Sequence, residues 1–197
     1  MTNLVFASAN ANKIAEIGAK LATISNNPLK IIGLTDINCH DDIPETRDTI
    51  EGNALQKAEY IVEHYNMDCF SEDTGLEIAA LNGEPGVKSA RYAGEQRSSS
   101  DNMQLVLTKM ANETNRKARF KTVIALKMNG ETHLFEGIIN GTIRTEPSGT
   151  DGFGYDPIFQ PDGYDTTFAE MTKATNNKIS HRALAVDKLL SHLISSH

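Results

Sequence analysis

The stretch Ala118–Ile143, ARFKTVIALKMNGETHLFEGIINGTI, predicts a long β-hairpin. In its first half, apolar or β-branched side chains occupy alternate positions, the period of a half-buried strand: Phe120, Thr122, Ile124, Leu126 and Met128. The dipeptide Asn129-Gly130 follows, and it is typical of a two-residue hairpin turn because both residues readily adopt positive φ. We therefore expect two long strands joined at residues 129–130.

Shorter segments on either side of this hairpin alternate between strand-like and helix-like patterns. Strands are expected at residues 3–7, 30–34, 68–72 and 76–81. Helices are expected over residues 10–24 and 54–65. A third is expected to follow Ser99 or Asp101 as its cap and to run to about residue 112, and a last one is expected to follow Ser180 as its cap. Early strand–helix alternation and a late hairpin together predict an α/β fold, with a mixed β-sheet flanked by helices in one domain spanning residues 1–197.

The composition excludes several classes of protein. A formal charge of −7 over 197 residues argues against a nucleic-acid or anionic membrane surface, so an anionic ligand would need a local cation cluster or a metal ion. No apolar run approaches the roughly 20 residues of a membrane span, and the start of the chain lacks the features of a signal peptide. The two cysteines form no CxxC motif and fit a reducing compartment. We therefore expect a cytoplasmic protein without nucleic-acid or membrane partners.

Two adjacent carboxylates, Glu72 and Asp73, end the strand expected at residues 68–72. Thr74 and Gly75 are expected to turn the chain, so that the two acids point to opposite faces unless the turn begins between them. Two interpretations stay open. Asp73 makes an Asx-turn with Gly75, or the acids act with Glu45 on a hard cation such as Mg²⁺, which takes oxygen ligands.

Cations occur in the first turns of two expected helices. Lys13 ends the segment SANANK, and Arg182 lies in SHRALA. A positive charge at a helix N-terminus opposes the helix dipole, which indicates a bound anion or a base carbonyl nearby. For Lys13, a surface lysine with Asn10 or Asn12 as the helix cap is an equally good interpretation.

Two further segments carry side chains that could face a ligand. Lys57 lies one helical turn after Asn53, so the two share a helix face that points either into a cleft or to water. The loop SGTDGFGYDPIF, residues 148–159, places Phe153 and Tyr155 among glycines and beside Asp156. Aromatic side chains in such a loop stack on a nucleobase or anchor the loop in a small core.

Taken in order, five segments resemble the inosine triphosphate pyrophosphatase family, which hydrolyses ITP, dITP and XTP. They are SANANK, PETRDTIEGNALQKA, SEDTGLEIAALNGEPGVKSARYAGE, GTDGFGYDPIF and ISHRALA, and the resemblance runs from residue 4 to about residue 190. It implies an elongated mixed sheet with flanking helices, in two lobes with a nucleotide-binding cleft between them. It also implies a homodimer and Mg²⁺ as cofactor. The implied reaction converts a nucleoside triphosphate to the monophosphate and pyrophosphate, and so cleanses the nucleotide pool.

The resemblance also implies roles for individual residues. Glu45 and Asp73 become the metal ligands, with Asp73, Glu72 and Lys57 as the catalytic residues. In this scheme Asp73 or Glu72 orients or deprotonates the attacking water, and Lys57 touches the phosphate chain. The implied substrate-binding residues are Ser8, Asn10 and Lys13 at the phosphates, Thr74 in the expected turn, Phe153, Gly154, Tyr155 and Asp156 around the base, and Asn176, His181 and Arg182 at the base, the last two at its 6-oxo edge.

Two positions depart from the family pattern. Glu72 stands where the family usually has Asp, and Asn176 stands where the family has a lysine that reaches the base, with Lys173 and Lys178 nearby. Two alternative functions stay open, a pyrophosphatase for other modified nucleotides and a non-catalytic nucleotide-binding module. The presence of Glu45, Lys57 and Asp73 together argues against the binding module, because binding alone needs no acid to activate water.

Overall fold

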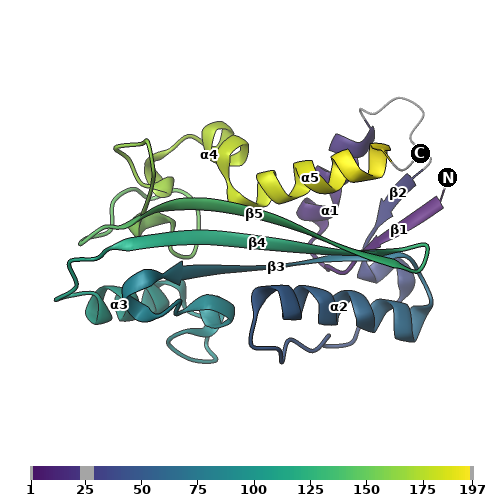
Figure 1. Ribbon diagram of the computed structural model, residues 1–197, viewed down its shortest axis with the longest axis horizontal. Coiled ribbons are helices and arrows are strands. Elements are labelled where there is room, and N and C mark those ends of the chain that lie inside the picture. Colours follow the sequence, from purple (N-terminus) through teal and green to yellow (C-terminus); the bar gives the residue numbers. More distant parts are fainter. Residues whose placement is uncertain (1, 23–28, 196–197) are drawn as a thin grey trace. The chain divides into compact units, whose positions relative to one another are not determined.

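The fold is built on a mixed β-sheet, seen in a computed structural model that describes residues 2–22 and 29–195. Within these residues the sheet has six strands in the spatial order β2-β1-β3-β4-β5-β6 (Figure 1). The strands are β1 (Thr2–Phe6), β2 (Leu29–Ile32), β3 (Cys69–Ile78), β4 (Lys117–Met128), β5 (Glu131–Ile143) and β6 (Phe159–Pro161). β1 pairs in parallel with β2 and β3, whereas β5 and β6 pair antiparallel, so the prediction of a mixed sheet flanked by helices is confirmed.

The described α-helices are α1 (Ala11–Ala22), α2 (Ile50–Tyr65), α3 (Ser99–Lys109), α4 (Lys173–Ile179) and α5 (His181–Ser195). Short 3-10 helices lie at Leu34–Ile37, Ala79–Leu81, Gly86–Arg91, Asp156–Ile158 and Phe168–Glu170. None of the described helices is both long and apolar enough to cross a membrane. The sequence pattern did not indicate α4, and Ile24, expected in the first helix, lies outside the described residues.

The predicted helix caps have different outcomes. Ser180 caps α5 as expected, because its Oγ accepts a hydrogen bond from the Ala183 amide at 3.2 Å. The third helix begins one residue earlier than expected. The hydroxyl of Ser98 accepts from the Asp101 amide at 3.2 Å, so the expected cap at Ser99 or Asp101 is wrong.

The long hairpin is confirmed. β4 and β5 are joined by Asn129 and Gly130, whose φ angles of 53° and 80° are the positive values that this turn requires. The backbone amide of Asn129 also donates to Asp68 Oδ1 at 3.1 Å, which ties the turn to the residue that precedes β3.

The expected turn at Thr74 and Gly75 is wrong. β3 continues without interruption from Cys69 to Ile78, and β1 and β4 flank it in the sheet. Thr74 Oγ1 lies 2.7 Å from Thr122 Oγ1 on β4, and Gly75 is buried. Pairing with neighbouring strands overrides the local turn preference, and the extended backbone at Asp73 excludes the Asx-turn.

The chain divides into two compact units, and the division falls inside β3, β4, β5 and α5. The first unit consists of Met1–Asp73, Val123–Glu136 and Ala185–His197. The second unit consists of Thr74–Thr122 and Gly137–Leu184. The expectation of a single domain over residues 1–197 stays a prediction.

In the first unit, helices cover both faces of the sheet. One face packs against α1 and α5, and its core includes the stacked rings of Phe6 and Phe70, whose centroids are 4.6 Å apart. α2 lies against the other face, on the opposite side of the strands from α5 in Figure 1. There the buried Ser71 hydroxyl donates to the Ala54 carbonyl of α2. This arrangement brings the starts of α1 and α2 to the two faces of β3.

The second unit has its own core, built from α3, parts of β3–β5, β6 and the segments that follow. Three aromatic rings form its centre, with the Phe120 and Phe159 centroids 4.6 Å apart and Phe168 packed 5.3 Å from Phe159. Leu76 and Ile78 of β3 are fully buried in the same cluster. β3 therefore contributes its first part to one core and its second part to the other.

Candidate functional site

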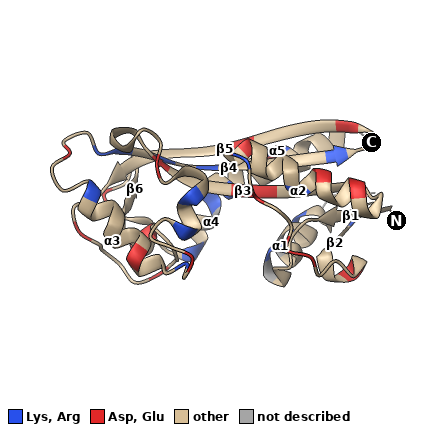
Figure 2. Cartoon of the chain, turned by 90° about the horizontal axis from the view of Figure 1, so that it is seen from below, with Lys and Arg blue, Asp and Glu red and all other residues tan. Residues whose placement is uncertain are grey.

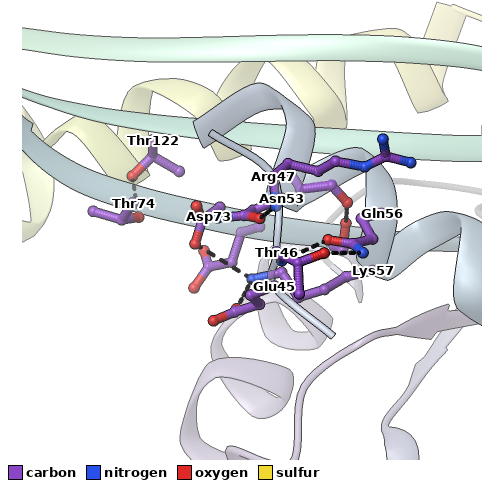
Figure 3. Close-up of polar contacts among 12 residues, drawn as sticks. Glu45, Thr46, Arg47, Asn53, Gln56, Lys57, Asp73, Thr74 and Thr122 are labelled. Atoms are coloured by element: carbon purple, nitrogen blue, oxygen red, sulfur yellow. Dashed lines mark hydrogen bonds and ion pairs between the residues drawn. The ribbon is translucent and has the colours of Figure 1, made fainter. Parts of the chain in front are cut away.

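Two of the predicted acids meet one lysine in the first unit. Lys57 Nζ on α2 lies 2.5 Å from Glu45 Oε1 and 3.4 Å from Asp73 Oδ1 (Figure 3). The Lys57 and Asp73 side chains are only 11% and 14% exposed, so these charges interact in a partly desolvated setting. Of the two directions that the sequence left open for Lys57, the structure shows the one toward these carboxylates and not the one to water.

A second ion pair lies at the start of α1. Lys13 Nζ is 2.6 Å from Glu72 Oε1, and the Glu72 side chain is 8% exposed. The backbone amide of Lys13 donates to Asn10 Oδ1 at 3.2 Å. The backbone amide of Asn10 donates to Ser8 Oγ at 3.1 Å. The structure thus brings Ser8, Asn10 and Lys13 together, and the carboxylate of Glu72 offsets the cation that opposes the helix dipole.

The two adjacent acids of β3 serve different helices. Glu72 pairs with Lys13 of α1, whereas Asp73 contacts Lys57 of α2. Because α1 and α2 cover opposite faces of the strands, the expectation that the two acids point to opposite faces is confirmed.

Glu45 and Asp73 have the chemistry of a magnesium site. Their carboxylate oxygens converge on one ammonium group, and Mg²⁺ typically takes one or two carboxylates together with waters and substrate phosphates. Among the described residues, no group of three or more His, Cys, Asp and Glu is arranged to hold a metal ion. The residues present therefore fit a metal that phosphate oxygens help to hold, and their role as ligands stays a prediction.

The predicted base-binding residues gather in the second unit. A cavity of about 280 Å³, here called the Tyr155 cavity, is lined by residues from every segment that the resemblance assigns to the base except α4. The predicted residues among its lining are Thr74, Phe153, Gly154, Tyr155, Asp156, His181 and Arg182. Thr74 takes part from within strand β3 and not from a turn.

A second cavity of about 540 Å³, here called the Asn176 cavity, shares part of this lining. Phe153, Asp156, His181 and Arg182 border both cavities, whereas Asn176 borders only the second. Lys173, which precedes Asn176 by one turn of α4, also lines it, and Figure 2 shows basic residues on this helix. Of the two lysines near Asn176, Lys173 is therefore the one that borders the cavity.

The two aromatic residues of the glycine-rich loop have different surroundings. Tyr155 is 5% exposed and its hydroxyl donates to the Ser89 carbonyl at 2.8 Å, so this ring anchors the loop. Burial raises the pKa of the Tyr155 hydroxyl. The Phe153 ring is 73% exposed and is available for stacking. The anchoring interpretation therefore applies to Tyr155, whereas stacking of Phe153 on a base stays a prediction.

Asp156 is a buried acid that shapes the same loop. Its side chain accepts a hydrogen bond from the Phe153 amide at 3.0 Å, and the residue is 8% exposed. Burial raises the pKa of the Asp156 carboxyl to about 6, although the Phe153 amide and the positive charge of Arg182 both lower it. Arg182 at the start of α5 therefore acts on a neighbouring carboxylate, as Lys13 does at the start of α1.

His181 packs at the start of α5. Its ring stacks on Phe120, with centroids 4.9 Å apart and an angle of 17° between the planes. This contact ties the cavity lining to the aromatic core of the second unit. His181 and Arg182 thus reach the cavity from adjacent positions in the same helical turn.

Sequence reasoning assigned no role to several residues of these sites. Ser89 lines the Tyr155 cavity, and Asn102, 4% exposed on α3, donates to the carbonyls of Ser89 and Ala90. Lys173 of the Asn176 cavity was named only as one of two lysines near Asn176. The available signal was weak, because a single polar residue on a helix or in a Gly/Ser-rich loop is usually exposed.

Known proteins resemble this chain over nearly its full length. The family model of the Ham1 family matches residues 4–192. A relative named dITP/XTP pyrophosphatase from Flavobacterium johnsoniae is 53% identical over 193 residues, or 98% of each chain. One of the same name from Staphylococcus aureus is 38% identical over 98% of this chain and 97% of its own.

Solved structures agree with these relatives. The Ham1 protein of Staphylococcus aureus superposes with a TM-score of 0.93 at 37% identity over 100% of both chains. A nucleoside-triphosphatase, dITP/XTP pyrophosphatase from Mycobacterium abscessus gives a TM-score of 0.83 at 36% identity over 96% of this chain and 99% of its own. The resemblance seen in the five sequence segments is confirmed, and the chain belongs to the Ham1 family.

Proposed function

We propose that this protein hydrolyses non-standard purine nucleoside triphosphates, dITP and XTP among them, to the monophosphate and pyrophosphate. The observation that supports this proposal most strongly is the cluster in which Lys57 contacts both Glu45 and Asp73. The cluster occurs in a chain that is 53% identical to a relative named dITP/XTP pyrophosphatase. Such a group of fixed charges is better suited to a reaction at phosphate groups than to binding alone.

The chain's own residues support a reaction at the phosphates. A nucleoside triphosphate carries about four negative charges, so attack by water at the α-phosphorus depends on positioning and on stabilising the leaving pyrophosphate. Lys13 and Lys57 supply fixed positive charge for this purpose. When bound through Glu45 and Asp73, Mg²⁺ would neutralise phosphate oxygens and lower the pKa of a bound water.

Asp73 is the better candidate for the group that orients or deprotonates the water. Glu72 is held by Lys13 at 2.6 Å, whereas the contact between Asp73 and Lys57 is 3.4 Å. The longer contact costs less to rearrange when substrate arrives. Replacing Asp73 with Asn should abolish turnover while leaving the circular dichroism spectrum unchanged, and near-normal rates would refute this role.

The lining of the Tyr155 cavity supports a preference for 6-oxopurines. Arg182 is a donor and Asp156 is an acceptor when ionised, and both line this cavity. Hypoxanthine and xanthine present an acceptor at O6 and a donor at N1, whereas adenine presents the reverse pattern. A mismatch that leaves buried donors and acceptors unpaired can reject a base by several powers of ten.

One assay tests the proposal and separates it from its alternatives. Pyrophosphate release is measured for ITP, dITP, XTP, GTP, ATP and modified pyrimidine triphosphates, with Mg²⁺ and with EDTA. The proposal expects release from the first three that depends on Mg²⁺. Equal rates for ATP and ITP would refute the 6-oxo argument, and a preference for pyrimidines would favour the other nucleotide pyrophosphatase. Binding without any release would favour the binding module.

Three further expectations from the sequence belong to this proposal. These are a cytoplasmic location, a homodimer, and a nucleotide cleft. Cys39 and Cys69 are both free and buried, which supports a reducing compartment. Light scattering on the purified protein and fractionation of cells would test the first two.

A further inference from the structure

A polar strap carries Glu45 along helix α2. Residues 41–47, here called the Glu45 strap, have no regular secondary structure and run antiparallel to the helix. Four pairs of contacting residues show this direction: Asp41 with Tyr60, Glu45 with Lys57, Thr46 with Gln56, and Arg47 with Asn53. As the residue number rises along the strap, the number of the contacted helix residue falls, and Figure 3 shows the three pairs of Glu45, Thr46 and Arg47.

Two amide side chains of α2 hold the strap by its backbone. Asn53 Oδ1 accepts the Arg47 amide at 2.9 Å, and Asn53 is only 2% exposed. Gln56 makes two bonds to Thr46, accepting the backbone amide and donating to Oγ1, each at 2.9 Å. These contacts fix the two residues that directly follow Glu45.

The strap also lies close to the first turn of α2. A Cβ atom on Gly52 would lie 2.8 Å from Cβ of Arg47, so only glycine allows this approach without a shift. At the other end, the Tyr60 and Tyr65 hydroxyls donate to Asp41 Oδ2 at 2.8 Å and 3.2 Å. The strap is therefore anchored on both sides of Glu45 by contacts that do not involve its carboxylate.

The Glu45 carboxylate itself contacts Lys57. A cation bound by Glu45 and Asp73 would repel the Lys57 ammonium, so this contact would weaken when the cation is present. The backbone contacts made by Asn53 and Gln56 are neutral and would persist. They are therefore suited to hold Glu45 near Asp73 in the cation-bound protein.

We infer that Asn53 and Gln56 are positioning residues for the cation site, which they serve by fixing the backbone of the Glu45 strap. This inference rests on the proposed role of Glu45 and Asp73 as metal ligands. Removing a group that hydrogen-bonds to a metal ligand and orients it typically weakens metal affinity by about 10–100-fold. Their removal weakens cation binding and leaves the chemical step intact once the site is filled.

Gln56→Met tests the inference, because it removes the amide and keeps the size and helix preference of the side chain. Gln104→Met on α3, an exposed position, is the matched control. Without metal, hydrogen exchange at the Thr46 amide should be faster in Gln56→Met than in wild type. In a titration with Mn²⁺ alone, followed by electron paramagnetic resonance, the dissociation constant should rise about tenfold or more. Gln104→Met should change neither the exchange rate of the Thr46 amide nor the dissociation constant for Mn²⁺.

Two further variants complete the design. Gln56→Glu keeps the acceptor for the Thr46 amide and should restore much of the exchange protection. In assays of pyrophosphate release, Gln56→Met should regain the wild-type kcat at high Mg²⁺. Unchanged Mn²⁺ affinity in Gln56→Met, alongside weakened affinity in Glu45→Gln, would overturn the positioning role alone. Unchanged affinity in Glu45→Gln would overturn the proposed metal role and this inference with it.

Discussion

Replacing Asp156 with Asn should change stability in a way that depends on pH. The free energy of unfolding of the variant, minus that of wild type, should be larger at neutral pH than at acid pH. Burial raises the pKa of this carboxyl from 3.8 to about 6. The native state therefore binds the proton more tightly than the unfolded chain does. Stability attributable to Asp156 is complete below pH 3.8 and is lost as the pH rises through about 6.

The size of this effect follows from the shift in pKa. A difference of about two pKa units corresponds to about 3 kcal/mol of unfolding free energy, at about 1.4 kcal/mol per unit. Asn keeps an acceptor for the Phe153 amide but does not ionise, so it avoids the cost of burying the charge. The stability of Asp156→Asn minus that of wild type should therefore grow by up to this amount between pH 3.8 and pH 7.

Urea unfolding followed by circular dichroism at a series of pH values measures this difference. The carboxyl carbon resonance that disappears in Asp156→Asn identifies the group, and in wild type it should titrate near pH 6. Arg182→Gln should move that midpoint upward, because the guanidinium lowers the pKa. Asp151→Asn, at an exposed position of the same loop, is the control. A stability difference that stays constant with pH would refute the reasoning.

Two matched pairs of substitutions give further predictions for stability. Ser71→Ala removes a buried hydroxyl that donates to a helix carbonyl and should cost about 1–2 kcal/mol, whereas Ser191→Ala removes the same kind of bond at an exposed site and should cost little. Gly149→Ala should lower the melting temperature more than Gly163→Ala. Both positions have φ near 85°, but only at Gly149 would a Cβ meet backbone, at 2.4 Å. Equal losses within either pair would contradict the corresponding argument.

The long hairpin could be predicted because its signals are local. Alternation and the Asn129-Gly130 turn act on neighbouring residues, and the structure has both features where they were expected. The turn at Thr74 and Gly75 was wrong for the opposite reason. Strands from distant parts of the chain pair with both sides of β3, and no local pattern contains that information.

The candidate site could be predicted as a set of residues but not as a set of contacts. The ion pair between Lys13 and Glu72 joins positions 59 residues apart, and spacing alone could not reveal it. Lys13 did indicate a nearby anion, and the protein itself provides one in Glu72. Ser89 was missed, and the choice between Lys173 and Lys178 stayed open, because exposure and neighbours depend on tertiary packing.

The antiparallel direction of the Glu45 strap constrains how this part of the chain can change in length. Surface loops usually tolerate inserted residues at low cost, because closing a slightly longer loop adds little entropy. Here one residue inserted between Arg47 and Thr49 would break the match of Glu45 to Lys57, Thr46 to Gln56 and Asp41 to Tyr60 at once. Substitutions in this segment should therefore be accepted more readily than insertions or deletions, as is usual inside a helix.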